Sequence, residues 1–446
     1  MNRKVIHRKR CAWPLVLCAF LLPTIIHAQQ DTLSQADLPE KWSLENCLSY
    51  AKEHNISINT LRLTQKTNEQ SLILAKAATL PNLYGSLADD YTHYQKGSSG
   101  TTGSLGLSSE MTLYNGGTLK NNVKINKLNI QTAGLDVEAA KNSISISIIQ
   151  YFTNILMDKE TIGYYQDLVT TDSAIVKQME QKFNVGSAAK KDLIELTAQL
   201  ASDQYTLTTA RNTERTDKLY LKQLLQLPSY IQFEVASDSL VDNPTQDVTP
   251  LQDVMDSAMA SRPEVRSSQL AIDVAKLNLA NAMAGYKPTV TLSGGIGSSY
   301  QDYSGGVGRQ LGNNFYQQVG VSVSIPIFTR KANKTNEAKA KIALSQAQLD
   351  LQSTKMTLSQ AVEQAYITTQ NNISALNASV EQLKYNTEAY RISKEELRIG
   401  SANTVEFVQQ KNLYIQAIQS FTNAKYNALL SEKVYLFYRG DNLTIH

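Results

Sequence analysis

Two acidic residues stand at matching places in the chain, each six residues after a glycine. Asp192 follows Gly186, and Glu406 follows Gly400. If several copies of the chain met around one axis, these carboxylates would converge, and converging carboxylates attract and select cations. The alternative is a structural role, because an acid in the first turn of a helix interacts favourably with the helix dipole by about 0.3–1 kcal/mol. The spacing therefore predicts either a ring of charge or two stabilised helix starts.

No pattern in the sequence predicts catalysis or a metal site. Beyond residue 28 the histidines are His54, His93 and His446, which are too widely separated to suggest a triad or a His-based metal site. Cys47 stands alone in the same stretch, so no intrachain disulfide is expected. We therefore expect neither an enzyme nor a bound cofactor.

The first 28 residues have the pattern of an export signal. Five basic residues precede an apolar run over residues 11–26, and Ile26-His27-Ala28 resembles a signal-peptidase site. An uncleaved anchor helix is the alternative, but the run is short for a span and contains Pro14 and Pro23. Without residues 1–28, 38 basic and 40 acidic residues remain, a net charge of −2. The basic character thus belongs to the signal and predicts no nucleic-acid partner.

Long helices must position the two acidic residues, and the clearest of them follows directly after a strand. Apolar residues alternate with small or polar ones from Val319 to Ile327. Apolar residues then recur every seven positions: Leu344, Leu351, Leu358 and Ala365, and later Leu376, Leu383, Tyr390 and Leu397. This pattern predicts a coiled-coil helix over residues 331–398, roughly 100 Å long at about 1.5 Å per residue.

The order helix, β-hairpin, long helix, tip, helix occurs twice. Pro81 matches Pro288, 207 residues later, whereas Gly186 matches Gly400, 214 residues later, so the second hairpin is the longer one. We expect the following divisions: signal 1–28; first repeat 29–228, with hairpin 82–114 and tip 183–192; linker 229–250; second repeat 251–440, with hairpin 288–328 and tip 397–406; tail 441–446. The first repeat should begin with a single helix ending before Pro81.

Four strands per chain cannot close on themselves. Each candidate is near the ~9–11 residues that cross a bilayer at a tilt. An open sheet in hydrocarbon leaves unpaired N–H and C=O groups at both edges, each costing several kcal/mol, so other copies must complete it. Two copies would give eight strands and three would give twelve. The small polar faces of the strands favour the wider form.

The stretch from Trp42 to Gly440 resembles the TolC-like outer-membrane efflux proteins, through the order, spacing and duplication of short motifs. These are Trp42-Ser43-Leu44-Glu45-Asn46-Cys47-Leu48, Leu113-Tyr114-Asn115-Gly116-Gly117, Ile325-Pro326-Ile327-Phe328, Phe183-Asn184-Val185-Gly186 before Asp192-Leu193, and Leu397-Arg398-Ile399-Gly400 before Glu406-Phe407. The resemblance implies a mixed α and β membrane protein. Its trimeric twelve-stranded β-barrel, with four strands per chain, would continue into a long α-helical coiled-coil barrel.

The same resemblance implies the function and the partners. The chain would be the outer-membrane channel of a tripartite efflux or type I secretion system, a passive duct gated at its periplasmic end. It would form a homotrimer in contact with outer membrane lipid. A periplasmic adaptor protein and an inner-membrane transporter would complete the system.

Roles for particular residues also follow from the resemblance. Adaptor contacts would fall on Val185, Gly186, Ile399 and Gly400, where the alternative is a helix C-cap without a partner. The gate would be an acidic constriction at Glu406, with Asp192 matching it only through the internal repeat. Gln409 stands one turn on, where the family can have a second acid, so a less cation-selective constriction is expected.

An exported coiled-coil scaffold without channel activity is the main alternative, because heptads over this length suit a scaffold as well. Alternation in four short segments argues against it. A periplasmic enzyme is a third hypothesis. The sequence identifies neither the cargo nor the transporter that the chain would serve.

Overall fold

The computed structural model describes residues 38–97, 99–236, 248–301 and 306–441. The chain divides into two units, Met1–Pro39 and Glu40–His446, and the fold is that of the second unit. The expected signal lies outside the described residues. Residues 237–247 of the expected linker and most of the expected tail lie outside them as well.

Two helices open the first half, where the sequence predicted one. α1 covers Leu44–His54 and α2 covers Ile56–Ala77, with Asn55 in an extended conformation between them. The Asn55 side chain accepts a hydrogen bond from the Ser57 amide at 2.9 Å and donates one to the Leu224 carbonyl at 3.3 Å. Such an N-cap starts a new helix, so the prediction of a single helix was wrong.

The second half is interrupted at the matching place. α5 covers Leu251–Ser261, α6 covers Pro263–Ala284, and Arg262 is extended between them. The cause is Pro263, because the residue before a proline is disfavoured in the helical conformation and proline suits the first position of a helix.

One antiparallel sheet, in the order β1-β2-β3-β4, is formed by strands from both halves of the described chain. The bounds are β1 Tyr84–Thr92, β2 Gly100–Asn115, β3 Thr289–Gln301 and β4 Tyr316–Ser324. β4 therefore begins and ends three residues earlier than the predicted strand over Val319–Ile327. The glycine-rich stretch after β3 contains a short helix, α7, over Val307–Asn313.

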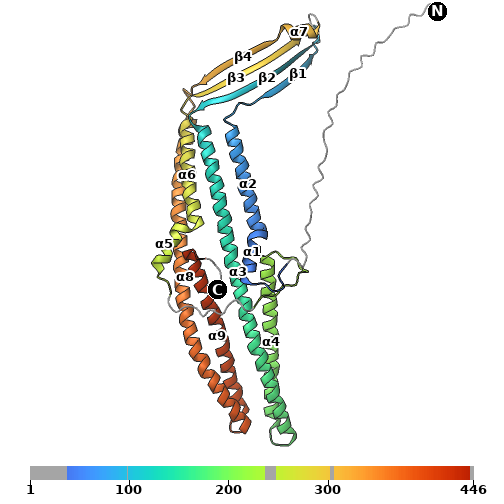
Figure 1. The fold of residues 1–446 in the computed structure, drawn as a ribbon, viewed down its shortest axis with the longest axis vertical. Helices are drawn as coiled ribbons and strands as arrows, with labels where there is room; N and C mark the ends of the chain where they lie inside the picture. The colour runs from blue at the N-terminus through green and yellow to red at the C-terminus, as the bar shows by residue number, and fades with distance from the viewer. Residues whose placement is uncertain (1–37, 98, 237–247, 302–305, 442–446) are drawn as a thin grey trace, which may run out of the picture. The chain divides into compact units, whose positions relative to one another are not determined.

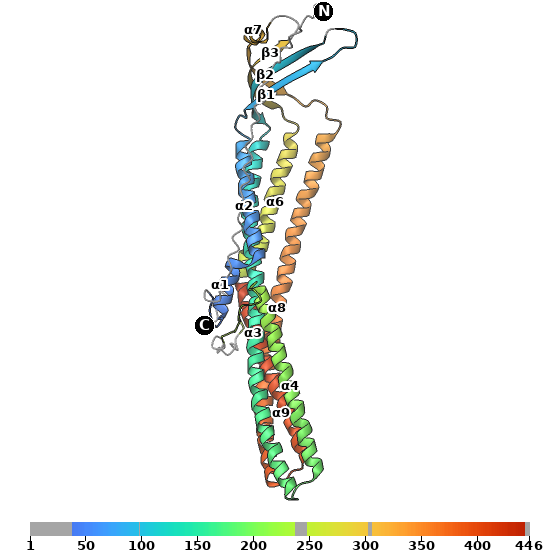
Figure 2. The same cartoon turned by 90° about the vertical axis from the view of Figure 1, so that its right-hand side faces the viewer.

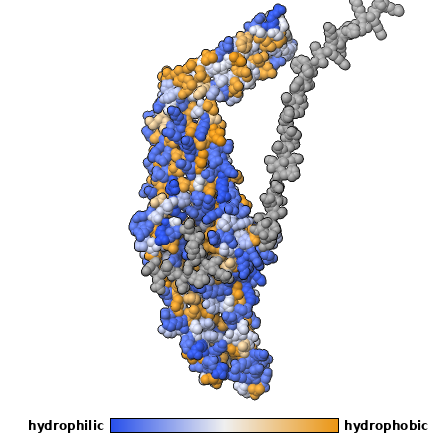
Figure 3. All heavy atoms as spheres, in the orientation of Figure 1, coloured by the Kyte–Doolittle hydropathy of each residue, from blue (hydrophilic) through white to orange (hydrophobic). Residues whose placement is uncertain are grey.

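The two faces of the sheet differ in character. Leu107 pairs with Ile296 on one face, whereas Ser104 pairs with Ser299 on the other, since their positions along each strand differ by an odd number. Figure 3 shows hydrophobic residues gathered over the sheet. Every residue of the edge strands β1 and β4 is exposed. The sheet thus has an apolar face and two edges that no other strand of the described residues covers.

Four long helices form the rest of the unit. They are α3 Thr118–Asn184, α4 Lys190–Leu224, α8 Ala332–Ile399 and α9 Thr404–Arg439. α2, α3, α6 and α8 extend side by side from the sheet, and α3–α4 and α8–α9 form two hairpins at the opposite end (Figure 1, Figure 2). Among the described helices, none has both the length and the apolar content required to cross a membrane.

Buried residues follow the seams between helices. Ile148 and Phe152 of α3 are fully buried. One cluster, formed by Val254, Ala258, Val362 and Tyr435, holds α5 against α8 and α9. A second cluster joins the two hairpins near their turns and forms part of the candidate site.

Candidate functional site

Both turns between the paired long helices depend on a glycine with positive φ. Gly186, after α3, has φ of 76°, and Gly400, after α8, has φ of 81°. The amides of the next residues, Ser187 and Ser401, donate to carbonyls five residues earlier at 2.8 and 2.9 Å. This is the hydrogen-bond pattern of a Schellman helix end, in which glycine supplies the left-handed conformation. The two turns are therefore built alike.

The side chains before these glycines point into solvent. Val185 is 78% exposed and Ile399 is 67% exposed. A Cβ atom added at Gly186 or Gly400 would meet no atom within 4 Å, so the restriction at each glycine is conformational rather than steric. The structure thus places all four predicted contact residues at the two hairpin turns, where the surface is open.

The two predicted gate residues lie in the first turns of α4 and α9, next to the hairpin turns. Glu406 is exposed, and its amide donates to the side chain of Asn403 at 2.9 Å, which caps α9. Asp192 is half-buried in α4, where the capping position is held by Ala189 and no side chain caps the helix. Both carboxylates are favourably placed for the helix dipole. Within one chain this placement fits either of the predicted roles.

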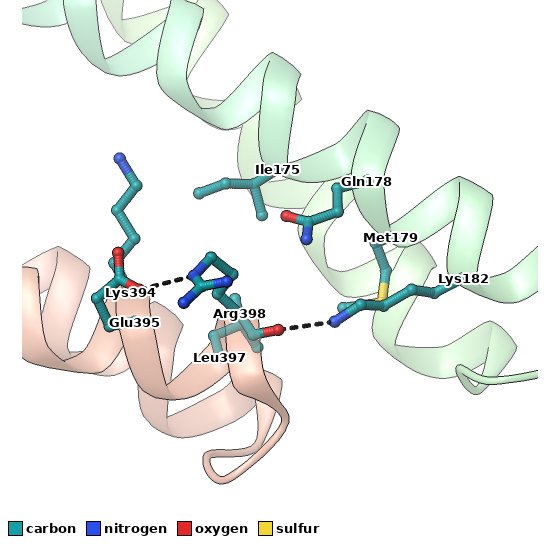
Figure 4. Close-up of a pocket in the computed structure, with 8 residues that line it drawn as sticks. All are labelled: Ile175, Gln178, Met179, Lys182, Lys394, Glu395, Leu397 and Arg398. Atoms are coloured by element: carbon teal, nitrogen blue, oxygen red, sulfur yellow. Dashed lines mark hydrogen bonds and ion pairs between the residues drawn. The ribbon is translucent and has the colours of Figure 1, made fainter.

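The hairpins contact each other close to their turns. Met179, Leu196, Leu397 and Phe407, one from each of α3, α4, α8 and α9, form a buried cluster. Figure 4 shows the neighbouring cavity, of about 70 Å³. Beside it, the Lys182 ammonium donates to the Arg398 carbonyl at 3.2 Å. The position of one turn relative to the other is therefore fixed by apolar contacts and a hydrogen bond.

A buried charge cluster, which the sequence reasoning missed, lies further along the same hairpins. Lys411 of α9 forms ion pairs with Asp172 of α3 and Asp203 of α4. Lys411 is 0% exposed and both acids are 4% exposed. Buried charges are tolerated only when they are paired. The cluster therefore ties α9 to both helices of the other hairpin.

The electrostatics of this cluster are unbalanced, since two carboxylates face one ammonium. Burial, and the hydrogen bond that protonated Asp172 donates to the Asp203 carboxylate, raise the pKa of Asp172 to about 7, against the lowering effect of Lys411. Tyr390 of α8 lies nearby: its ring stacks on Tyr414 at 4.7 Å, and its buried hydroxyl has no hydrogen-bond partner among the described residues. Burial also raises the pKa of Tyr390. Protonation of one acid near neutral pH would balance the charge.

A signal for this cluster was present in the heptads. Asp203 comes seven residues after the buried Leu196, and Asp172 lies seven residues before the buried Met179. Lys411 comes seven residues after the buried Thr404. A charged residue at a position that otherwise carries buried side chains predicts a buried partner on the facing helix.

No group of His, Cys, Asp or Glu in the described parts of the chain is arranged to hold a metal ion. A sheet with an apolar face, joined to long paired helices, is the architecture of solved outer-membrane channels. The sequence model of the family "Outer membrane efflux protein" matches residues 47–226 and again residues 254–433. The chain belongs to this family. It is an efflux protein of the outer membrane that extends into the periplasm, and not an enzyme.

Similar proteins and structures cover most of the chain at low identity. The outer membrane efflux protein BepC of Brucella suis is 20% identical over 95% of this chain and 89% of its own length. The outer membrane protein TolC of Escherichia coli K12 is 24% identical over 63% of this chain and 58% of its own length. The crystal structure of CusC superposes with a TM-score of 0.79 over 90% of this chain and 92% of that one, at 17% identity. The Campylobacter jejuni CmeC channel superposes with a TM-score of 0.76 over 90% of this chain and 86% of that one, at 19% identity.

Proposed function

We propose that three copies of this chain form a passive duct through the outer membrane and across the periplasm. The observation that carries the proposal is the open sheet: β1 and β4 are exposed along their whole length, and one face of the sheet is apolar. Such edges in hydrocarbon require partners, because unpaired backbone groups there cost several kcal/mol each. Three copies of the four-stranded sheet give a twelve-stranded barrel around a lumen, continued by the long helices.

The hairpin turns are the proposed contact with a periplasmic adaptor, which would link the duct to an inner-membrane transporter in tripartite efflux or type I secretion. Support comes from Val185 and Ile399, large apolar side chains that the chain leaves in solvent beside tightly specified glycine turns. Exposed apolar residues at such a place mark an interaction surface.

Glu406 is the proposed constriction residue, with Asp192 in support. Its exposed position in the first turn of α9, beside the hairpin turn, allows the carboxylates of three copies to converge. A ring of three carboxylates in a confined space attracts cations. The carboxylates also repel one another, so their negative charges are costly to maintain.

The test is reconstitution of the purified protein in planar lipid bilayers. A duct should give stepwise ion conductance and should require detergent for its extraction from outer-membrane fractions. A coiled-coil scaffold would instead appear in the aqueous fraction and give no conductance. Folded protein that behaves in that second way would exclude the duct.

A further inference from the structure

A cavity of about 420 Å³ lies where four helices meet, remote from the hairpin turns. α9 ends there and α6 begins, between α3 and α8 (Figure 1). Residues from all four helices line it: Ala139, Asn142, Ser143, Ile146, Arg262, Glu264, Ser353, Thr354, Thr357, Leu358, Ala361, Phe437 and Tyr438. Its volume falls in the range of about 300–1,000 Å³ typical of small-molecule sites.

Arg262 is the unusual member of this lining. The residue is 7% exposed, yet its guanidinium makes no hydrogen bond or ion pair with any residue in the described ranges. It stacks over the rings of Phe437 and Tyr438, 4.2 and 4.7 Å from their centroids. Stacking occupies the faces of a guanidinium but leaves its N–H donors, which lie in the plane, without acceptors. Burial lowers the pKa of Arg262, and the negative charge of the neighbouring Glu264 partly offsets this effect.

The surroundings of Arg262 favour an anion. The Asn142 side chain also lacks a hydrogen-bond partner among the described residues, and Thr357 adds a hydroxyl to the wall. These groups are donors for an oxygen anion. Glu264 in the same lining attracts Arg262 and repels an anion, so the occupant should carry no more than one negative charge.

The rest of the wall is apolar. Ile146, Leu358 and Ala361 face the cavity together with the two aromatic rings. We propose that this cavity binds a small, singly charged carboxylate with an apolar body, its carboxylate paired with Arg262. Arginine suits this role because its planar fork matches the two oxygens of a carboxylate. This site is independent of the proposed duct. The bound molecule would contact α3, α6, α8 and α9 at the place where the end of α9 lies beside the start of α6.

Calorimetric titration of the full-length protein in lipid nanodiscs with octanoate tests this proposal. We expect saturable binding of one octanoate per chain and weaker binding of octanamide, which has the same tail without the charge. Arg262→Gln should weaken octanoate binding about tenfold or more, because a hydrogen bond to a charged group is lost. Arg266→Gln is the matched control, an exposed arginine one turn along α6, and should leave binding unchanged.

Equal octanoate binding by the wild type and Arg262→Gln, or binding that does not saturate in the wild type, would overturn the proposal. If Arg262→Gln fails to assemble, Asn142→Leu and Thr357→Val test the same wall without removing the buried charge, and each should weaken octanoate binding. Unchanged affinity in both would count against the site. The titration measures binding and requires no transport. Failure to bind octanoate would therefore not contradict the proposed duct, and absence of conductance would not contradict this binding site.

Discussion

Lys411 of α9 is ion-paired in the protein interior with Asp172 of α3, which lies 239 residues earlier in the chain. Asp203 of α4 completes the cluster. The two hairpins that carry the turns are therefore joined by charge as well as by apolar contacts. The contribution of this connection can be measured.

Lys411→Met should destabilise the packing of the two hairpins. It removes the only cation that faces two buried carboxylates in the described cluster, and breaking a buried pair costs about 3–5 kcal/mol. The thermal denaturation midpoint, followed by circular dichroism, should fall clearly. Lys384→Met is the control, because Lys384 is exposed and 3.6 Å from Glu381, and loss of such a pair costs about 0–1 kcal/mol. Similar midpoints for both variants would contradict the assignment.

Stability should depend on pH through Asp172. Its pKa is raised from 3.8 to about 7 in the folded chain, chiefly by burial. A raised pKa means that the contribution to stability is fully present below the unfolded value and is lost as pH rises through the folded value. The free energy of unfolding should therefore fall between about pH 4 and about pH 7, by no more than about 1.4 kcal/mol per pH unit. The denaturation midpoint should fall with it, and should fall less in Asp172→Asn. An equal slope in the variant would assign the dependence to other groups.

Gly400→Trp should abolish export while leaving assembly intact, because it places a large side chain on the proposed adaptor surface. Complementation of a strain that lacks its own outer-membrane channel provides the assay. Gly306→Trp is the matched control, since a Cβ atom meets no atom within 4 Å at either glycine. Gly400→Ala is a second control. It carries the cost of a side chain at positive φ, about 1–2 kcal/mol, without the bulk of tryptophan. Equal loss of export from Gly400→Trp and Gly306→Trp would argue against docking at the turn.

Glu406→Gln should lower the preference of the purified channel for cations in planar bilayers, and Asp192→Asn should lower it less. Glu406 is the proposed constriction residue, whereas Asp192 occupies the matching place only through the internal repeat. Reversal potentials in a salt gradient measure the preference. Unchanged selectivity in Glu406→Gln, with assembly intact, would leave Glu406 as a charge at a helix start.

Periodicity predicted the long helices because an α-helical heptad and a β alternation repeat over many residues. The predicted helix over 331–398 corresponds to α8 at Ala332–Ile399. The break at Asn55 had a local signal, since asparagine is a preferred N-cap, but the apolar pattern on both sides was read as one helix. Its second contact, with the Leu224 carbonyl 169 residues away, is not visible in a local pattern. The short helix α7 was not predicted, because glycine disfavours a helix and two of its residues are glycines.

The candidate site was predicted unevenly. Glycines that follow an exposed apolar residue located both turns, since a reversal of long helices requires positive φ there. The cluster around Lys411 was readable from charged residues at heptad positions but needed the pairing of α3, α4 and α9 to identify its partners. No sequence motif indicated a site at Arg262, because its cavity forms only where the end of α9 lies beside the start of α6.

Native mass spectrometry of the detergent-solubilised protein measures how many copies of the chain assemble. Four strands with two open edges require completion by other copies, and a duct with a lumen requires three. We expect a complex with the mass of three chains that survives in detergent. A stable, folded monomer or dimer would contradict it.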